Sequence, residues 1–191
     1  MVAVDPNIAA LRNIASALGP LREEVLFVGG ATAGLLITDP AAMAIRATDD
    51  VDCIVEIAST TEYYAFECRL RARGFSSDPG LVCRHRFDGI ALDVMPTDPS
   101  ILGFANRWAA EAFSAGKRHA LAKDLHINII DAPYFVATRL EAFYGRGDGD
   151  FVASHDIEDL VVIVDGRREL VDEVTILNNE ALKTYLRGQF T

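Results

Sequence analysis

The sequence predicts an α/β fold of the α+β kind, in which a sheet-containing unit is followed by a helical C-terminal portion. Short apolar runs of strand length alternate with stretches of helical periodicity between Val25 and Asp131. The Asp88-Gly89 pair lies between two of these runs and is a strong two-residue hairpin signal. After Asp131 the apolar residues recur at helical spacing. We therefore expect a core unit in residues 1–131 and a helical portion in residues 132–191, with a soft boundary and the alternative of a single domain.

Composition limits both the fold and the function. With 191 residues and 50% hydrophobic content, the chain is long enough for one sizeable core. The net charge of -10 and the pI near 4.8 argue against a broad nucleic-acid-binding surface, whereas a small anionic substrate held through a metal stays compatible. The three cysteines, Cys53, Cys68 and Cys83, have no paired spacing, which argues against a disulfide framework and a zinc cluster.

The sequence also predicts the cellular setting. The N-terminus carries Asp5 and Pro6 with no basic segment and no apolar stretch of signal length, and no run is long enough to span a bilayer. Together with the unpaired cysteines, this predicts a soluble protein of the reducing cytoplasm that makes no membrane contact.

Each predicted element has a local signal. Asp5-Pro6 starts a first helix, with the acid as its N-cap, and Gly19-Pro20 ends it. The predicted strands are Val25–Val28, a run that opens with Asp50, Leu81–Phe87, Ile90–Met95, and a pair within Arg118–Ile130 that turns near Lys123-Asp124. The further predicted helices are a short apolar helix after Gly30, Thr60–Gly74, one near Trp108, one from Ala132-Pro133 to Gly145, His155–Asp165, and two pieces within Arg167–Thr191. The stretch Gly147–Asp150 is predicted to be a loop.

Two helices have predicted inward and outward faces. The apolar side of the helix Thr60–Gly74 and the end that follows it is expected to consist of Tyr63, Tyr64, Phe66, Leu70 and Phe75. For the helix His155–Asp165 we expect Ile157, Leu160, Val161 and Val164 to face inward and Asp156, Glu158 and Asp159 to face solvent.

Three acids within strand-like runs form the main candidate for chemistry. In the run Asp50-Val51-Asp52, residues two apart share a face, so both carboxylates project together. Asp93 lies in the middle of the apolar run Ile90–Met95, where a carboxylate needs a partner. If the two strands pair, the three acids surround a site for hard cations, which suits Mg²⁺, with Mn²⁺ as the alternative.

The residues before this acidic strand offer possible contacts to phosphate. Gly29-Gly30 follows the first strand, where paired glycines either form a tight turn or let backbone N–H groups approach a phosphate. Arg46 and Thr48 lie on the polar approach to Asp50. Arg46 either solvates the surface or contacts a phosphate.

The order Gly29-Gly30, Asp50-x-Asp52 and then Asp93 on a later strand resembles the nucleotidyltransferase superfamily that includes DNA polymerase beta. The stretch Tyr134–Asp159 carries Arg139 in mid-helix, followed by His155-Asp156-Ile157-Glu158-Asp159. This stretch is similar to the AbiEii-type nucleotidyltransferase toxins, whose C-terminal half carries a lysine or arginine and an Asp-x-x-Asp pair. Arg139 stands where many relatives have lysine, and the interval from Gly30 to Asp50 is longer than in compact members, which predicts an extra loop over the site.

The resemblance implies a mixed sheet with packed helices and the transfer of a nucleoside monophosphate from an NTP with release of pyrophosphate. It implies that Asp50, Asp52 and Asp93 hold magnesium ions and that Asp93 accepts a proton from the attacking hydroxyl. Gly29 and Gly30 would donate backbone hydrogen bonds to phosphates. Arg139 would act as a fixed cation, and the alternative is a solvated position on its helix.

Other interpretations of the same residues stay open. An Asp-x-Asp phosphohydrolase would need its acids at the C-terminal end of a buried strand, whereas these acids begin the run. A nucleotidyltransferase-like binding module would keep the fold without catalysis. The acceptor could be an RNA end, a protein hydroxyl or a small molecule, and the resemblance implies a possible cognate antitoxin protein. The roles of His155, Asp156 and Asp159 are not predicted.

Overall fold

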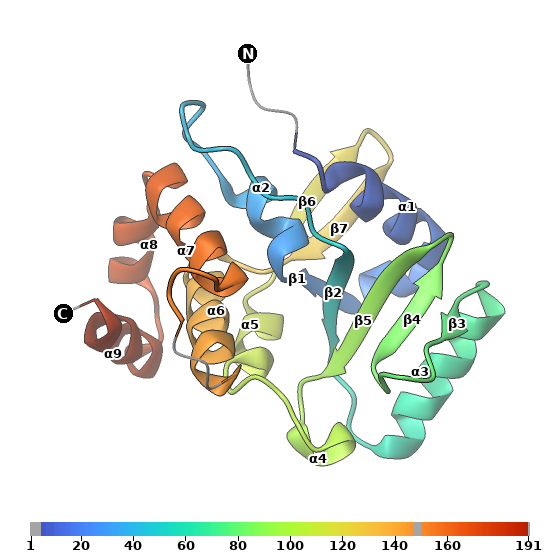
Figure 1. Ribbon diagram of the computed structural model, residues 1–191. Coiled ribbons are helices and arrows are strands. Elements are labelled where there is room, and N and C mark those ends of the chain that lie inside the picture. Colours follow the sequence, from blue (N-terminus) through green and yellow to red (C-terminus); the bar gives the residue numbers. More distant parts are fainter. Residues whose placement is uncertain (1–4, 147–149, 191) are drawn as a thin grey trace.

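A mixed seven-stranded sheet forms the centre of the molecule (Figure 1). The computed structural model describes residues 5–146 and 150–190. The order of the strands is β3-β4-β5-β2-β1-β7-β6. Their bounds are β1 Val25–Val28, β2 Asp50–Val55, β3 Ser76–Ser77, β4 Arg84–Phe87, β5 Ile90–Pro96, β6 Lys117–Ala122 and β7 Leu125–Ile129. The predicted α/β architecture is therefore confirmed.

The pairing of the central strands decides where the site lies. Strand β2 pairs parallel with β5 and antiparallel with β1, and β1 pairs parallel with β7. In the β2–β5 register Asp52 lies opposite Asp93, and in the β1–β2 register Val28 lies opposite Asp52. The end of β1 and the start of β2 therefore meet at one edge of the sheet, beside the middle of β5.

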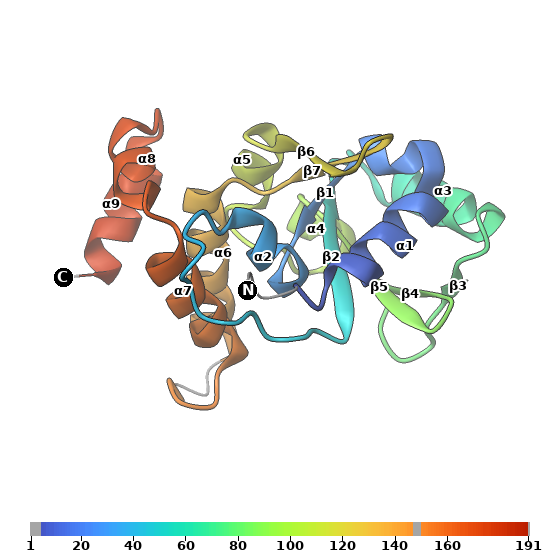
Figure 2. The same ribbon diagram turned by 90° about the horizontal axis from the view of Figure 1, so that it is seen from above.

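Helices cover both faces of the sheet (Figures 1 and 2). Helices α1 and α3 pack on one face, α5 and α6 on the other, and α7, α8 and α9 lie beyond α6. The helix bounds are α1 Ile8–Leu18, α2 Ala33–Leu36, α3 Thr60–Ala72, α4 Pro99–Leu102, α5 Ala109–Ser114, α6 Ala132–Arg146, α7 His155–Gly166, α8 Leu170–Ile176 and α9 Glu180–Gln189; the 3-10 turns are η1 Gly19–Glu23 and η2 Gly30–Thr32. The helical C-terminal portion predicted from the sequence is thus observed.

Local signals in the sequence account for several of these boundaries. Asp88 (φ 50°) and Gly89 (φ 78°) both have positive φ, as a two-residue hairpin between β4 and β5 requires. Ser59, Ser154 and Asn179 cap α3, α7 and α9 by accepting a hydrogen bond from the backbone N–H three residues later.

One hydrophobic core extends from the sheet into the C-terminal helices. Phe27 on β1, Phe135 on α6 and Ile163 on α7 are completely buried members of the same cluster. The predicted boundary at residue 131 falls between β7 and α6 and stays a prediction. None of the described helices combines the length and the apolar character needed to cross a membrane.

The predicted faces of two helices were partly wrong. On α7, Asp156 and Asp159 are only 1% and 2% exposed, whereas Val161 and Val164 are each 49% exposed. The physical reason is that the acids pair with arginines of the neighbouring segments, so the polar side of this helix faces inward. On α3, Tyr64 is exposed, because it is adjacent to the buried Tyr63 and points about 100° away from it.

Other differences are local. The strand predicted to begin at Leu81 begins at Arg84, and Leu81 is exposed. Strand β3 and helix α4 were not predicted, because both are very short. Helix α1 begins after Asn7, and Asp5 accepts a hydrogen bond from the Asn7 backbone N–H instead of serving as N-cap. Residues 147–149 of the predicted Gly147–Asp150 loop lie outside the described residues.

Candidate active site

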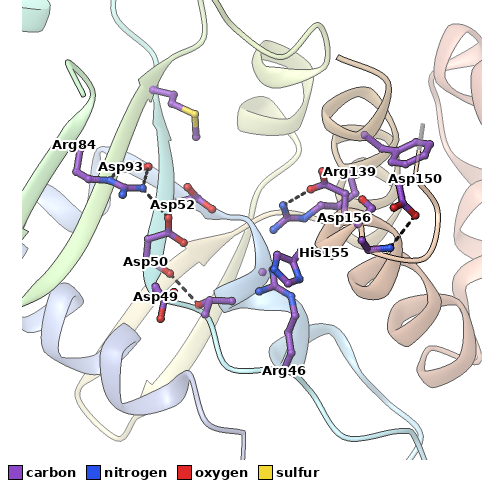
Figure 3. A pocket seen from close by; sticks show the side chains of 16 residues that line it. Arg46, Asp49, Asp50, Asp52, Arg84, Asp93, Arg139, Asp150, His155 and Asp156 are labelled. Atoms are coloured by element: carbon purple, nitrogen blue, oxygen red, sulfur yellow. Dashed lines mark hydrogen bonds and ion pairs between the residues drawn. The ribbon is translucent and has the colours of Figure 1, made fainter. Parts of the chain in front are cut away.

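A cavity of about 830 Å³ lies between the sheet edge and helices α6 and α7 (Figure 3). One wall is formed by Gly30 just after β1, the start of β2, the middle of β5 and the start of β4. Helices α6 and α7, with the segment before β2, form the opposite wall. The ionisable residues that line the cavity are Arg46, Asp49, Asp50, Asp52, Arg84, Asp93, Arg139, Asp150, His155 and Asp156.

The three predicted acids come together on the sheet wall. One carboxylate oxygen from each of Asp50, Asp52 and Asp93 lies within 4.8 Å of the other two. The strand alternation holds as expected, since Val51 and Cys53 are completely buried on the opposite face. Asp93 is only 7% exposed, whereas Asp50 and Asp52 are partly exposed to the cavity. The three carboxylates therefore form one cluster open to solvent on one side.

Arg84 is the partner of two of these acids and was missed by the sequence analysis. Its Nε donates to Asp93 Oδ1 at 2.7 Å, and its Nη2 donates to Asp93 Oδ2 at 2.7 Å and to Asp50 Oδ2 at 2.8 Å. The signal that could have found it is the hairpin. A two-residue turn at Asp88-Gly89 pairs Phe87 with Ile90, and counting outward places Arg84 opposite Asp93, as observed.

Asp52 is the acid whose ionisation is most disturbed. The pKa of its carboxyl is raised from 3.8 to about 7, mainly by burial; the positive charge of Arg139 opposes this shift, the negative charges of Asp50 and Asp93 add to it, and Arg84 also opposes it. Within the described part of the chain no side chain donates a hydrogen bond to Asp52. In the absence of a bound cation its negative charge is therefore poorly stabilised.

The two glycines after β1 allow close approaches to both walls. Gly29 has a φ of +77°, and a Cβ there would overlap Asp52 Oδ2 and lie 2.9 Å from Asp52 Cβ. A Cβ on Gly30 would lie 2.9 Å from Arg46 Nη2 and 3.0 Å from Asp159 Oδ2. Packing and backbone conformation therefore require glycine at position 29, and a side chain at position 30 would press on Arg46 and Asp159, whether or not the N–H groups of the two glycines also bind phosphate.

The opposite wall carries a network of two arginines and two buried acids. Arg139 Nη1 lies 2.9 Å from Asp156 Oδ1, and its Nη2 lies 3.1 Å from Asp159 Oδ2. Arg46 Nε lies 2.9 Å from Asp159 Oδ1, and its Nη2 also donates to Asp159 at 3.2 Å. The Arg139 side chain is only 12% exposed, so the alternative that it lies on a solvated helix face was wrong. The network joins α6, α7 and the segment before β2.

The remaining candidates occupy the edge of the cavity. Thr48 Oγ1 donates to the Asp50 carbonyl at 3.0 Å. The buried Asn7 side chain accepts from the Thr48 N–H at 2.9 Å and donates to the Arg46 carbonyl at 3.0 Å. These bonds fix the segment that leads into β2. His155 is largely exposed, and its ring lies 3.4 Å from Glu158.

The acid cluster fits a divalent metal ion. Magnesium and manganese prefer carboxylate oxygens, and a small number of protein carboxylates leaves positions for water and phosphate. The cluster offers three such ligands on one wall of a cavity, and one of them, Asp52, carries a charge that burial disfavours. A bound cation would remove that cost.

The sequence matches no protein-family model and no curated protein. Solved structures are similar over nearly the whole chain. The structure of an antigenic nucleotidyltransferase-like protein from Paracoccidioides brasiliensis has a TM-score of 0.56 and 17% identity, covering 98% of this chain and 88% of that one.

The solution structure of the antibiotic-resistance factor ANT(2'')-Ia has a TM-score of 0.55 and 13% identity, covering 98% and 95% of the two chains. Its crystal structure in complex with adenylyl-2''-tobramycin has a TM-score of 0.53 and 15% identity, covering 96% and 98%. At these identities the likeness shows the fold. The chain therefore has a nucleotidyltransferase-like fold, with a carboxylate triad on one wall of its cavity.

Proposed function

We propose that the protein is a metal-dependent nucleotidyltransferase that moves a nucleoside monophosphate from an NTP to an acceptor hydroxyl and releases pyrophosphate. The single observation that supports this best is the cluster of Asp50, Asp52 and Asp93 within 4.8 Å. The cluster faces a wall with positioned arginines across a cavity of about 830 Å³, a size typical of small-molecule sites.

Each wall has its own part in the proposed reaction. Asp50, Asp52 and Asp93 would hold Mg²⁺, or Mn²⁺ in its place. When bound, such ions supply positive charge to the triphosphate oxygens and to the leaving pyrophosphate. Arg139 stays charged at working pH, so it can stabilise negative charge on phosphate but cannot act as a base.

The proposed step is a substitution at the α-phosphorus. The acceptor hydroxyl oxygen forms a bond to this phosphorus, and the bond from the phosphorus to the oxygen that bridges to the β-phosphate breaks. The electron pair of that bond leaves with pyrophosphate. The hydroxyl proton passes to a carboxylate of the triad, and we assign this role to Asp93.

The position of the acids in the sheet disfavours an Asp-based phosphohydrolase. In open α/β sheets substrates bind beyond the carboxyl ends of the strands. Asp50 is the first residue of β2 and Asp52 the third, so both lie at the amino end of that strand. The acids are therefore placed differently from a nucleophile of that class.

For the acceptor we propose a hydroxyl of a small molecule ahead of an RNA end or a protein hydroxyl. The net charge of -10 disfavours a nucleic-acid acceptor. ANT(2'')-Ia, which has a similar fold, is known in complex with adenylyl-2''-tobramycin, a small molecule that carries an adenylyl group.

A transfer assay tests this proposal. Each of the four labelled NTPs is incubated with the protein, Mg²⁺ and one acceptor pool: hydroxyl-bearing small molecules including tobramycin, transfer RNA, or the protein alone. We expect transfer to a small molecule that is lost in Asp52→Ala. Binding of NTP and Mg²⁺ with no transfer to any pool would instead support a binding module without catalysis.

A toxin role is a narrower proposal that rests on the resemblance to AbiEii-type toxins alone. Induced expression of the parent protein in a bacterial host should arrest growth, and Asp52→Ala should not. Arrest by both proteins, or by neither, would contradict the toxin role and leave the transferase proposal standing. A cognate antitoxin would be sought as a protein that co-purifies with the parent and restores growth.

A further inference from the structure

We propose that Arg84 is a built-in counter-cation of the triad that must exchange with a divalent metal ion. Without metal, its guanidinium holds Asp50 and Asp93. When metal binds, Arg84 releases these acids and pairs with a phosphate of the nucleotide. Arg84 would thus lower the affinity for metal alone and make metal and nucleotide bind together. This inference rests on the proposed function.

The contacts of Arg84 use the acceptor atoms that a metal ion would need. Both oxygens of Asp93 accept from Arg84 at 2.7 Å, and one oxygen of Asp50 accepts at 2.8 Å. Bidentate, charge-assisted hydrogen bonds of this kind are the strongest that a carboxylate forms with a side chain. The same two carboxylates are members of the cluster with metal-ligand geometry. A guanidinium and a metal ion therefore compete for them.

The charge balance predicts the direction of this competition. Three carboxylates and one guanidinium leave the sheet wall with an excess of negative charge, so a divalent ion is still attracted. However, a guanidinium in contact with two of the ligands repels an incoming cation. Removal of Arg84 should therefore tighten the binding of metal in the absence of nucleotide.

The place of Arg84 gives the released side chain a new partner. It lines the same cavity as the triad, and its side chain is 26% exposed, so it is not sealed in the core. Arginine binds phosphate with the same bidentate geometry that it uses for carboxylates. A triphosphate beside the triad would therefore replace the acids as the partner of Arg84. Because coupling between two ligands is reciprocal, nucleotide should raise the affinity for metal and metal should raise the affinity for nucleotide.

Arg86 provides a matched control. It lies two residues along the same strand on the same face, and its Nε pairs with Asp78 at 3.0 Å, outside the residues that line the cavity. It is the same residue type on the same strand and is also paired with an aspartate, although it is more exposed than Arg84. Arg86→Ala therefore reports the loss of a strand arginine without touching the triad.

The direct test measures Mn²⁺ binding by electron paramagnetic resonance without nucleotide. The samples are the metal-free parent, Arg84→Ala, Arg84→Lys and Arg86→Ala. We expect Arg84→Ala to bind Mn²⁺ about tenfold more tightly than the parent, Arg84→Lys to lie between them, and Arg86→Ala to match the parent within about twofold. Unchanged or weaker binding by Arg84→Ala would overturn the exchange.

A second measurement on the parent protein does not depend on the folding of a variant. The Arg84 Nε–H signal is followed by NMR while Mg²⁺ and a non-hydrolysable NTP are added. We expect the signal to shift when both are present. A signal that stays in its metal-free position at saturation would overturn the proposal.

The two proposals fail separately. If the parent protein transfers nucleotide but Arg84→Ala binds Mn²⁺ with unchanged affinity, the exchange of Arg84 with metal is wrong and the transferase proposal stands. If Arg84→Ala binds Mn²⁺ more tightly but the parent protein transfers nucleotide to no acceptor, the transferase proposal is wrong and Arg84 is still a counter-cation of the metal site.

Discussion

The two walls of the cavity differ in how their charges are balanced. The sheet wall brings together Asp50, Asp52 and Asp93 with only Arg84 in ionic contact among the described residues. The helix wall pairs two arginines with the buried acids Asp156 and Asp159. An unpaired buried charge lowers the free energy of unfolding, so its removal stabilises the protein. Removing one partner of a buried ion pair lowers the free energy of unfolding, because the other charge stays buried without a partner. The sheet wall should therefore gain stability when Asp52 is removed, and the helix wall should lose stability when one of its paired residues is removed.

The difference in charge balance also indicates different roles for the two walls: the sheet wall binds a ligand, and the helix wall stabilises the fold. On the sheet wall the single guanidinium of Arg84 faces three acids, and a bound cation would stabilise the remaining negative charge, as expected for a binding site. The helix wall holds Arg46 and Arg139 in place through the acids Asp156 and Asp159. It can present positive charge to a phosphate without needing a ligand to fold.

Asp52→Ala should produce the largest effect on activity and an opposite effect on stability. We expect nucleotide transfer to fall by about a thousandfold, roughly 4 kcal/mol, because an acid that holds metal is lost. The metal-free protein should melt about 3 °C higher than the parent, because mutual repulsion in the triad is relieved. Labelled-NTP transfer and thermal melts in EDTA measure the two effects. Undiminished transfer would remove Asp52 from the mechanism.

Arg139→Ala should destabilise the protein, in contrast to Asp52→Ala. Loss of this guanidinium leaves part of the charge of Asp156 and Asp159 buried without it, which costs about 3 kcal/mol. Transfer should also fall, and Arg139→Lys should recover part of both properties because it keeps the charge. Urea unfolding and steady-state kinetics at several NTP concentrations provide the measurements.

A surface arginine supplies the control for this experiment. Arg118 pairs with Glu23, and both side chains are largely exposed, so Arg118→Ala should change the free energy of unfolding by less than about 1 kcal/mol. If Arg139→Ala unfolds at the same urea concentration as Arg118→Ala, the helix wall is not a structural network.

Alanine substitutions at the adjacent glycines Gly29 and Gly30 should affect the two walls differently. At Gly29 the positive φ and the overlap with Asp52 should lower the free energy of unfolding by about 2 to 3 kcal/mol and weaken Mn²⁺ binding. Gly30→Ala presses on Arg46 and Asp159 instead and should cost about 1 to 2 kcal/mol with Mn²⁺ binding retained. Equal losses of Mn²⁺ affinity in both variants would contradict this division.

The pH dependence of stability provides a further test of how charge is balanced on the sheet wall. The pKa of Asp52 is raised from 3.8 to about 7, so between these values the folded protein holds a proton that the unfolded chain has released. The contribution of Asp52 to stability therefore becomes more unfavourable as the pH rises from about 4 to about 7, and it stays constant above that.

Asp52→Asn removes this dependence because its side chain stays neutral. In EDTA it should be about 2 kcal/mol more stable than the parent at pH 8 and equal to it near pH 4, the full shift being reduced because solvent reaches part of the side chain. Urea unfolding at both pH values measures the difference. A variant with the same advantage at both would show that burial of the Asp52 charge is not its cause.

The acids of the sheet wall were found in the sequence because each lies in a short strand-like run with its own local signal. Strand alternation placed Asp50 and Asp52 on one face, whereas the parallel pairing of β2 with β5, which brings Asp93 beside them, joins distant segments and was only a condition of the prediction. Even Arg84 follows from the hairpin turn, once the register is counted from Asp88-Gly89.

The helix wall was not predictable because its determinants are distant in sequence. Arg46 is 113 residues from its partner Asp159, and no local pattern connects them. The valines of α7 have the periodicity of a buried face, yet two of them are exposed because the ion pairs of Asp156 and Asp159 decide which side faces inward. Tertiary partners overrode the hydrophobic pattern.

The side-chain amide of Asn7 connects the residues before α1 to the candidate active site. Asn7 lies just before α1, and its buried side chain forms hydrogen bonds with the backbone of Arg46 and Thr48 in the segment before β2. The segment that it holds carries an arginine of one wall and leads directly into Asp50 of the other. A deletion through Asn7, or a fusion that pulls this residue from its place, would therefore behave as an active-site lesion. For assays of metal and nucleotide binding, an affinity tag belongs at the C-terminus.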